Sequence, residues 1–358
     1  MRARRLLCCL LLLAGCPSST STPSGFYDQA VGGLCQYLTR CGAYGNSELD
    51  QCKSAESAAF SDEQKYYNID DAVNQGRIKY NQDEANKCID AVNALHCNGG
   101  LGILTNGSSA CDNVVVGLVP MGGTCYSSSE CASGDCSNST TGCAGTCQGG
   151  TNNTCTSKSC ASGSYCNGFA CVPKVASGGT CTSLFSTQCQ DNLVCTPSAS
   201  YSSYTCLPLP GSGQPCSPLT GCTDGLYCDG TTHPASPVCA AQADNGSSCI
   251  QSNACKDGFV CISGTCAAFL DAGSKCTPSN FTGCPSDMTC ANGVCKTNGV
   301  GTDCTGSQVS CSFGYCDQTT GRCAEKVGYG EKCNPLAGSS CLSASCNTQT
   351  DTCSLQCQ

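Results

Sequence analysis

Residues 246–266 read GSSCIQSNACKDGFVCISGTC, and this stretch decides the fold. Units with the same four-cysteine plan open at eight places along the chain, at steps of 26 to 35 residues. Self-similarity at a regular step marks an array of small modules. A module of about 30 residues cannot bury enough apolar surface to offset its chain entropy, so it needs covalent bridges. The opening cysteines are Cys125, Cys155, Cys181, Cys216, Cys249, Cys276, Cys304 and Cys333.

Each unit carries turn signals at fixed places. Glycine stands three residues before the first cysteine in seven units, and Asn152 stands there in the Cys155 unit. Glycine reaches positive φ at no steric cost and asparagine is next best, so a turn is expected here. A small-then-bulky run before the third cysteine, residues 258–261 in the quoted unit, predicts a short β-ribbon whose aromatic residue covers a disulfide. Gly264, just before the fourth cysteine, predicts a tight hairpin turn.

The composition is that of an exported disulfide scaffold. The chain has 43 Cys and 42 Gly among 358 residues, no Trp, and only 12% charged residues. Zinc and metallothionein-like sites usually pair thiolates as C-x-x-C or C-x-C, and the mature chain has neither spacing. Only His96 and His233 are available as co-ligands. We therefore expect no metal and no cofactor.

The N-terminus has the pattern of an export signal. Three arginines at positions 2, 4 and 5 precede a nine-residue apolar run, residues 6–14, which is too short to span a bilayer. The run ends in Leu13-Ala14-Gly15-Cys16, which resembles a bacterial lipobox, so Cys16 is the predicted lipidation site. Ordinary signal-peptidase cleavage near Gly15 is the alternative. Cysteine parity favours lipidation: of the 43 cysteines, Cys8 and Cys9 are removed with the signal and Cys16 is modified, which leaves an even 40.

The chain divides into four predicted parts: a lipoprotein signal peptide at 1–15, a flexible Pro/Ser/Thr-rich tether at 16–25, a helical head at 26–117 and the array at 118–358. In the head, Phe26, Ala30, Leu34 and Leu38 fall on one helical face. The fold class expected is therefore a small disulfide-rich repeat array of short β-ribbons and loops, preceded by a small disulfide-bonded α-helical domain.

Two further helices are predicted in the head. Asn81 followed by Glu84 resembles a capping box that opens a cysteine-bearing helix, and Ser47 with Asp50 is a weaker start signal for a helix ending near Ala58. Six head cysteines imply three disulfides, whose connectivity stays open because six cysteines allow fifteen pairings. The predicted structural disulfide residues in the head and first unit are Cys35, Cys41, Cys52, Cys88, Cys97, Cys111, Cys125, Cys131, Cys136 and Cys143.

The first and last units each carry a fifth cysteine at the same spacing, Cys147 and Cys357. If these two cysteines pair with each other, they close the array into a ring. Alternatively, each joins a neighbouring unit. We favour the second interpretation, because terminal repeats are usually atypical and closing a loop of some 200 residues is entropically costly.

The segments GRIKYN (76–81), CDNVVVG (111–117) and GGTCYSSSEC (122–131) resemble a family of myxobacterial Cys-rich lipoproteins, whose array is commonly matched to the Dickkopf N-terminal cysteine-rich domain. The resemblance implies a lipid anchor and an array of small disulfide modules. It implies no activity, and the Wnt antagonism of Dickkopf proteins does not carry over, because function lives in sites rather than scaffolds.

The sequence offers little material for catalysis. His96 is expected at the end of the last head helix and His233 in a solvated loop, and neither has a nucleophile at a known spacing. The acid pairs Asp62-Glu63, Asp70-Asp71 and Asp83-Glu84 are interpreted as surface or first-turn acids. The formal net charge of −9 falls to −12 without the signal arginines, and no basic stripe exists, so nucleic acid is not an expected partner.

Two classes of function remain, and neither is an enzyme. The first is a lipid-anchored surface protein, a disulfide-stapled stalk for adhesion or recognition that contacts the membrane through Cys16 and binds an unknown protein or glycan. The second is a protease inhibitor that presents rigid inter-cysteine loops. The long loops at 196–205 and 229–238 lack a consistent basic or large apolar residue beside a cysteine, which favours the first class.

Overall fold

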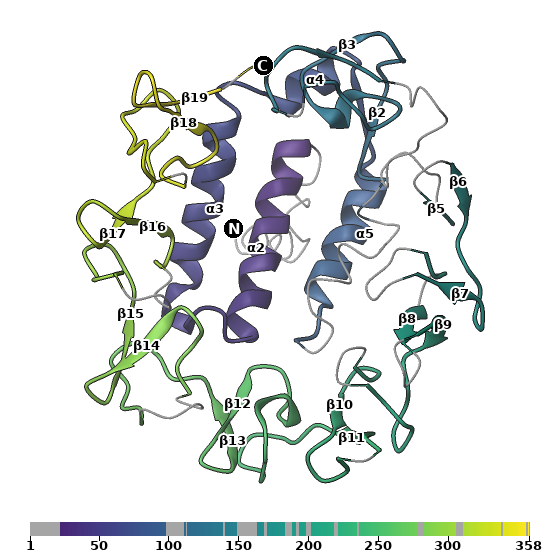
Figure 1. Ribbon diagram of the computed structural model, residues 1–358, viewed down its shortest axis with the longest axis vertical. Coiled ribbons are helices and arrows are strands. Elements are labelled where there is room, and N and C mark those ends of the chain that lie inside the picture. The colour runs from purple at the N-terminus through teal and green to yellow at the C-terminus, as the bar shows by residue number, and fades with distance from the viewer. Residues whose placement is uncertain are drawn as a thin grey trace, which may run out of the picture.

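The chain folds as a ring of disulfide-bonded units around a small group of helices (Figure 1). This arrangement confirms the predicted fold class, a disulfide-rich repeat array of short β-ribbons after a small helical region. The computed structural model describes residues 22–97, 111, 113–138, 140–148, 163–167, 170–182, 188–190, 193–197, 202–217, 221–234, 236–277, 283–305, 311–337, 339–355 and 357.

The helical head contains α2 (Pro23–Arg40), α3 (Leu49–Glu63), α4 (Ile69–Asn74) and α5 (Gln82–Asn93). Helices α2, α3 and α5 lie side by side in the centre of the molecule (Figure 1). Their packing forms a small core in which Phe26, Leu34 and Leu38 of α2 contact the buried residues Tyr37, Ala85, Cys88, Val92, Leu95 and Val114. The face predicted for the first helix therefore contributes to the core.

The start of α2 corrects the predicted tether. Composition predicts a tether that reaches residue 25, but the helix begins at Pro23, with Thr22 as its N-cap. The Thr22 hydroxyl accepts the Gly25 N–H at 3.1 Å, and proline is favoured at the first helical position because its missing N–H needs no partner there. Threonine followed by proline is itself a helix-start signal, which the Pro/Ser/Thr-rich composition concealed.

The other two predicted helices differ in detail from expectation. Helix α3 begins at Leu49, after a 3-10 turn at Asn46–Glu48, and runs to Glu63 rather than ending near Ala58. Asn81 is the N-cap of α5, but the predicted capping-box bond from its side chain is wrong. The Asn81 amide instead donates to the Asn113 carbonyl at 2.7 Å, next to the pairing of β1 (Ile78–Tyr80) with β2 (Val115–Gly117).

Three disulfides hold the head together, and the structure selects one of the fifteen pairings. Cys35–Cys52 joins α2 to α3. Cys41–Cys97 joins the end of α2 to the segment after α5. Cys88–Cys111 joins α5 to the segment that leads into β2.

The array units share one plan of interleaved bridges. In the Cys249 unit the first cysteine pairs with the third and the second with the fourth, as Cys249–Cys261 and Cys255–Cys266. These sulfurs replace an apolar core, and Phe259 and Tyr227 pack against them, as the expected aromatic cover requires. The same order holds in Cys181–Cys195 with Cys189–Cys206, Cys216–Cys228 with Cys222–Cys239, Cys276–Cys290 with Cys284–Cys295, Cys304–Cys316 with Cys311–Cys323, and Cys333–Cys346 with Cys341–Cys353.

The predicted hairpins are present as short antiparallel ribbons. In the Cys249 unit the ribbon turns through Ser263 and Gly264, with φ of 50° and 84°, the two positive values of a type I′ turn. The paired strands are β3 (Thr124–Cys125) with β4 (Gly145–Thr146), β5 (Ser164–Cys166) with β6 (Cys171–Pro173), β7 (Thr180–Cys181) and β8 (Leu193–Pro197) with β9 (Tyr204–Pro208), β10 (Leu226–Asp229) with β11 (Val238–Ala241), β12 (Phe259–Ile262) with β13 (Thr265–Ala268), β14 (Met288–Ala291) with β15 (Val294–Thr297), β16 (Gly314–Asp317) with β17 (Arg322–Glu325), and β18 (Ser345–Asn347) with β19 (Thr352–Ser354).

The glycine before each unit has the conformation that its position predicts. Gly246 has φ of 82°, and its N–H donates to the carbonyl of Cys266, the fourth cysteine, at 2.8 Å. The N–H of Cys266 in turn donates to the carbonyl of Ser247 at 2.8 Å. All seven glycines at this position have positive φ, and each donates its N–H to the carbonyl of the cysteine that completes the second bridge of its unit. A side chain at this φ would be strained, so the turn selects glycine.

The array closes on itself, which corrects the interpretation that we favoured for the fifth cysteines. Cys143 pairs with Cys357 across 214 residues. Cys147 pairs with Cys131 and accepts the Gly122 N–H, so it occupies the place of a fourth cysteine. The ring alternative was therefore right about closure but named the wrong cysteine of the first unit. We call the junction of the first and last units at Cys143–Cys357 the seam.

The expected stalk is wrong in shape, because the array curves around the helices (Figure 1). The units contact the head at several points, which offset the entropy of closing the ring. Within the described residues, no helix combines the length and the apolar character needed to cross a membrane.

We predict twenty disulfides and no free thiol in the mature chain. Eighteen disulfides join described cysteines, and Cys166 and Cys171 are also disulfide-bonded. Cys155 and Cys160 lie outside the described residues. Thiol titration under denaturing, non-reducing conditions should find fewer than about one reactive thiol per chain. Four or more would contradict the scaffold.

Candidate functional site

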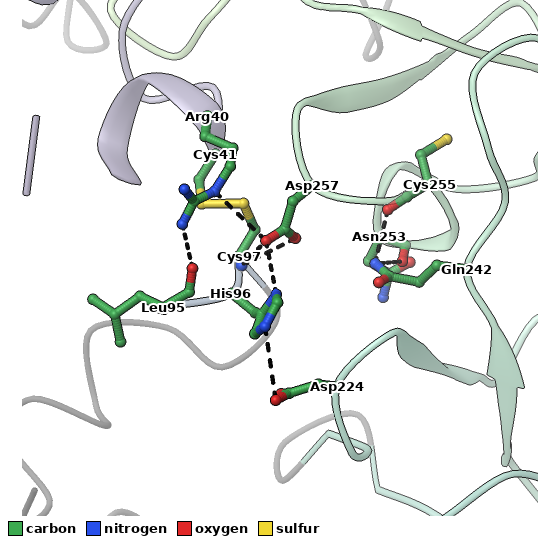
Figure 2. Close-up of polar contacts among 10 residues, drawn as sticks. All are labelled: Arg40, Cys41, Leu95, His96, Cys97, Asp224, Gln242, Asn253, Cys255 and Asp257. Atoms are coloured by element: carbon green, nitrogen blue, oxygen red, sulfur yellow. Dashed lines mark hydrogen bonds and ion pairs between the residues drawn. A yellow bond between two sulfur atoms is a disulfide. The ribbon is translucent and has the colours of Figure 1, made fainter. Parts of the chain in front are cut away.

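One group of polar contacts between ring and head surrounds Asp257, in the loop before β12 (Figure 2). The Asp257 carboxylate accepts the Cys97 N–H at 3.2 and 3.3 Å. His96 Nδ1 lies 3.1 Å from Asp257 Oδ2, and Arg40 Nε lies 3.7 Å from the same oxygen. One loop carboxylate therefore faces a backbone donor, an imidazole and a guanidinium of the head.

The ends of two helices place these groups. Arg40 is the last residue of α2, and the Cys41–Cys97 disulfide brings the segment after α5 beside it. The Arg40 guanidinium donates to the Leu95 carbonyl, and the Arg40 carbonyl accepts the Gly258 N–H at 3.1 Å. This group therefore fixes both helix ends to the Cys249 unit.

The arrangement around His96 suits attachment better than chemistry. His96 Nε2 lies 3.7 Å from Asp224 Oδ2, while Nδ1 faces Asp257. Nucleophilic catalysis requires a base beside a hydroxyl or thiol, and both ring nitrogens already face carboxylates. His96 lies just beyond α5 and His233 lies in an exposed loop beside Asp229, as predicted for both.

A second contact joins the loop after α2 to the Cys276 unit. Ser286 and Asp287 donate their N–H groups to the carbonyls of Gly42 and Ala43, at 2.8 and 3.2 Å. The Asp287 side chain is buried next to Glu48, whose carboxylate accepts the Gly45 N–H at 3.0 Å. Burial, together with the Glu48 carboxylate, raises the pKa of Asp287 to about 8. The contact therefore buries two acids side by side, and this arrangement favours the protonated form of Asp287.

A third contact corrects the interpretation of Asp62 as a surface acid. The Asp62 side chain is only 2% exposed and holds the last unit of the ring. Tyr329 N–H donates to it at 2.8 Å, Ser343 Oγ at 2.6 Å and Lys65 Nζ at 2.7 Å. Burial acts to raise the pKa of Asp62, but these hydrogen bonds outweigh it and hold the pKa below its ordinary value. Asp62 therefore lies on the side of α3 that the last unit of the ring covers.

A fourth contact lies at the start of the array. Glu130 is completely buried and accepts Arg77 Nε at 2.9 Å and the Tyr126 N–H at 2.9 Å. The Arg77 guanidinium also lies over the Tyr126 ring, 5.3 Å from its centroid. The Arg77–Glu130 ion pair thus fixes the first unit to the head. Removing either side chain would leave the other as an unpaired charge.

Several groups of three cysteine sulfurs lie within 4.8 Å of one another, the usual reach of a metal site. One such group is Cys249, Cys255 and Cys266. All three are in disulfides, and the ligand form of cysteine is the thiolate. The closeness of the sulfurs follows from two crossing disulfides and does not suit metal binding.

The other predicted residues have these outcomes. Cys16, the predicted lipidation site, lies outside the described residues. The ten cysteines predicted to form structural disulfides in the head and first unit are all bonded. Sequence reasoning missed Asp257, Asp287 and Glu130, each of which lies between two cysteines of its unit and therefore resembled an ordinary loop acid.

Comparison with known proteins finds no matching family model, no matching curated protein and no matching solved structure. The resemblance to Cys-rich lipoproteins and to the Dickkopf N-terminal domain therefore stays a prediction from the sequence.

Replacing Asp257 with alanine is expected to loosen the attachment of the Cys249 unit. The change removes the acceptor of the Cys97 N–H and unpairs Arg40, at a cost of about 2–3 kcal/mol for a hydrogen-bonded, mostly buried charge. Amide hydrogen exchange at Cys97 should become roughly 30-fold faster or more.

Asp224→Ala is the matched control, because the Asp224 side chain is 73% exposed and reaches His96 only at 3.7 Å. Its effect should stay below about 0.5 kcal/mol. Equal exchange rates in the two variants would show that Asp257 does not hold the ring.

Proposed function

We propose that this protein is a lipid-anchored extracytoplasmic protein that recognises protein or glycan ligands without catalysis. Its extensive disulfides support an extracytoplasmic, stable and non-enzymatic protein. The observation that carries the proposal is the closed ring, in which the Cys143–Cys357 disulfide holds the ends of the array together around the helices. Recognition by loops costs least when the loops are already ordered before binding.

The loop between β10 and β11 illustrates this preorganisation. Asp229 Oδ1 accepts the N–H groups of Thr231 and Thr232, at 3.1 and 3.0 Å. Hydrogen bonds from Thr232 lower the pKa of Asp229, so the carboxylate is favoured as acceptor. Such a loop presents its outer side chains with little conformational entropy left to lose, which serves recognition.

The proposed anchor fixes which end of the molecule lies near the membrane. Five residues separate Cys16 from Thr22, the N-cap of α2, so the lipid must lie within about 20 Å of Thr22. Ser24 Oγ donates to Asp70 Oδ2 at 2.7 Å, so the start of α2 lies beside α4. The α4 end of the helices therefore faces the membrane, and the units around β12 and β13, at the opposite end in Figure 1, are presented outward.

Replacing Cys16 with alanine tests the anchor. The variant should leave the membrane fraction, because the thiol that would carry the lipid is lost, whereas Ser19→Ala in the same segment should stay membrane-bound. A Cys16→Ala protein that remains in the membrane fraction places the anchor elsewhere.

Titration of the Cys16→Ala protein against a panel of proteases separates recognition from the alternative, protease inhibition. Recognition predicts no inhibition at micromolar protein. Stoichiometric inhibition of any protease would replace the proposed function by the alternative.

A further inference from the structure

A hollow of about 260 Å³ opens at the seam of the ring. Its floor is the end of α3 and the turn after it, with Glu63 and Tyr66. One wall comes from the first unit, with Thr140 and Thr141, and the other from the last unit, with Ser354 and Leu355 among its residues. Residues more than 200 positions apart in the sequence therefore line one site.

Two polar groups on residues that line this hollow have no hydrogen-bond partner among the described residues. The Glu63 carboxyl is half-buried, and no donor among the described residues reaches it. Ser354 Oγ is buried and has no hydrogen-bond partner within the described structure. Burial raises the pKa of Glu63, as expected of a carboxyl that has lost water without gaining a donor. Buried polar groups are normally paired, so the Glu63 carboxyl, which keeps part of its surface at the hollow, is placed to bond something from outside.

The lining indicates the chemistry of that ligand. The described lining residues carry hydroxyls from threonine and serine, one carboxyl, and the small apolar surfaces of Ala344 and Leu355, with no basic side chain among them. A phosphate or carboxylate would face Glu63 without a cation to pair it. An apolar ligand would leave the hydroxyls unpaired. A neutral ligand rich in hydroxyl groups satisfies the carboxyl, the hydroxyls and the apolar edge together.

We propose that the seam hollow binds one sugar residue of a glycan, with the Glu63 carboxyl accepting two sugar hydroxyls and the threonine hydroxyls of the wall, Thr140 and Thr141, bonding others. The volume matches one hexose better than a longer saccharide. The assignment rests on the proposed recognition function and specifies a ligand class and a site for it.

The site depends on the closed ring. Cys143 lies two residues after Thr141, and Cys357 lies two residues after Leu355, so the Cys143–Cys357 disulfide holds the two walls at one spacing. Opening this bond frees the walls from each other while the bridges within each unit stay intact. Sugar binding should therefore require the oxidised seam.

Titration of the full chain, carrying Cys16→Ala for solubility, tests the proposal. The probes are the methyl glycosides of glucose, galactose, mannose and N-acetylglucosamine, followed by calorimetry and saturation-transfer NMR. For a probe of about 13 heavy atoms at roughly 0.3 kcal/mol per atom, the expected dissociation constant is about 1 mM for the preferred sugar. Glu63→Gln should weaken binding at least about 10-fold, and Thr141→Val roughly 3-fold.

Two further variants test whether the binding is specific to Glu63 and to the closed ring. Glu325→Gln changes an exposed glutamate on β17 and should leave affinity unchanged. Cys143→Ser/Cys357→Ser should abolish binding although its other disulfides form. No binding of any probe at about ten times the expected dissociation constant overturns the site, and so does binding that survives both Glu63→Gln and ring opening. In that second case a sugar binds elsewhere, and the proposed recognition function stands while the seam site fails.

Discussion

The double variant Cys143→Ser/Cys357→Ser is expected to lose roughly 4–5 kcal/mol of unfolding free energy, the largest loss for any single bridge in the molecule. The bond closes a loop of 214 residues, and the entropy that a crosslink removes from the unfolded chain grows with loop length. The other bridges shorten the effective loop, so this loss of unfolding free energy is an upper limit. Guanidinium unfolding with the other disulfides intact measures the loss.

Cys333→Ser/Cys346→Ser provides the control, because it opens a loop of only 13 residues in the last unit and should cost about 3 kcal/mol. The two variants should also differ in shape. Small-angle scattering should report a larger maximum dimension for the seam variant, whose ring can open, and an unchanged one for the control. Equal dimensions would show that contacts with the head hold the ring closed without its covalent bond.

Raising the pH from about 5 to about 9 is expected to destabilise the protein through the buried pair Asp287 and Glu48. The pKa of Asp287 is raised to about 8, against about 3.9 for an unfolded aspartate, so between these values the folded chain binds more protons. The free energy of unfolding then falls as pH rises. The contribution is complete below about pH 4 and lost as pH passes about 8. Asp62, whose pKa is lowered, acts in the opposite sense but only in acid, outside this window.

Asp287→Asn isolates this effect. An amide carries no charge and can donate to Glu48, so the variant should be about 1–3 kcal/mol more stable than the wild type at pH 9 and nearly equal at pH 5. Guanidinium unfolding at pH 5, 7 and 9 follows the change. Asp50→Asn is the control, because its side chain is 99% exposed and should leave the pH profile unaltered. A wild type that is more stable at pH 9 than at pH 5 would contradict the shared proton.

The sequence predicts well those features that depend on neighbours along the chain. The turn at Gly246 and the hairpin at Gly264 each follow from local backbone geometry, and both are present. The helical face of α2 follows from periodicity, and the place of Asn81 as N-cap of α5 follows from the residue preference at that position, although its side chain makes no capping bond. The unit plan, the helical head and the fold class are therefore predictable from local patterns of residues.

Features that depend on distant segments are not predictable in this way. Pairing of Cys143 rather than Cys147 with Cys357 depends on which of two sulfurs the fold leaves free, and their spacings give no preference. Asp62 resembles any charged helix residue until the last unit covers it. The seam hollow is lined by both ends of the array, so no local sequence pattern predicts it. The nearest signal is the fifth cysteine in the terminal units, which suggests closure without identifying the partners.

The interleaved bridges also constrain the order in which the protein can be made. Cys143 emerges from synthesis long before its partner, Cys357, the last cysteine of the chain. Meanwhile Cys131 can reach Cys143 across 12 residues, the same separation that Cys341–Cys353 uses, although its native partner is Cys147. An oxidant that acts after Cys125–Cys136 has formed and before Cys147 emerges would trap this wrong pair and leave Cys357 without its partner. A chain trapped in this way reaches the native pairing only through thiol–disulfide exchange after Cys357 arrives, so yield should follow the supply of a disulfide isomerase.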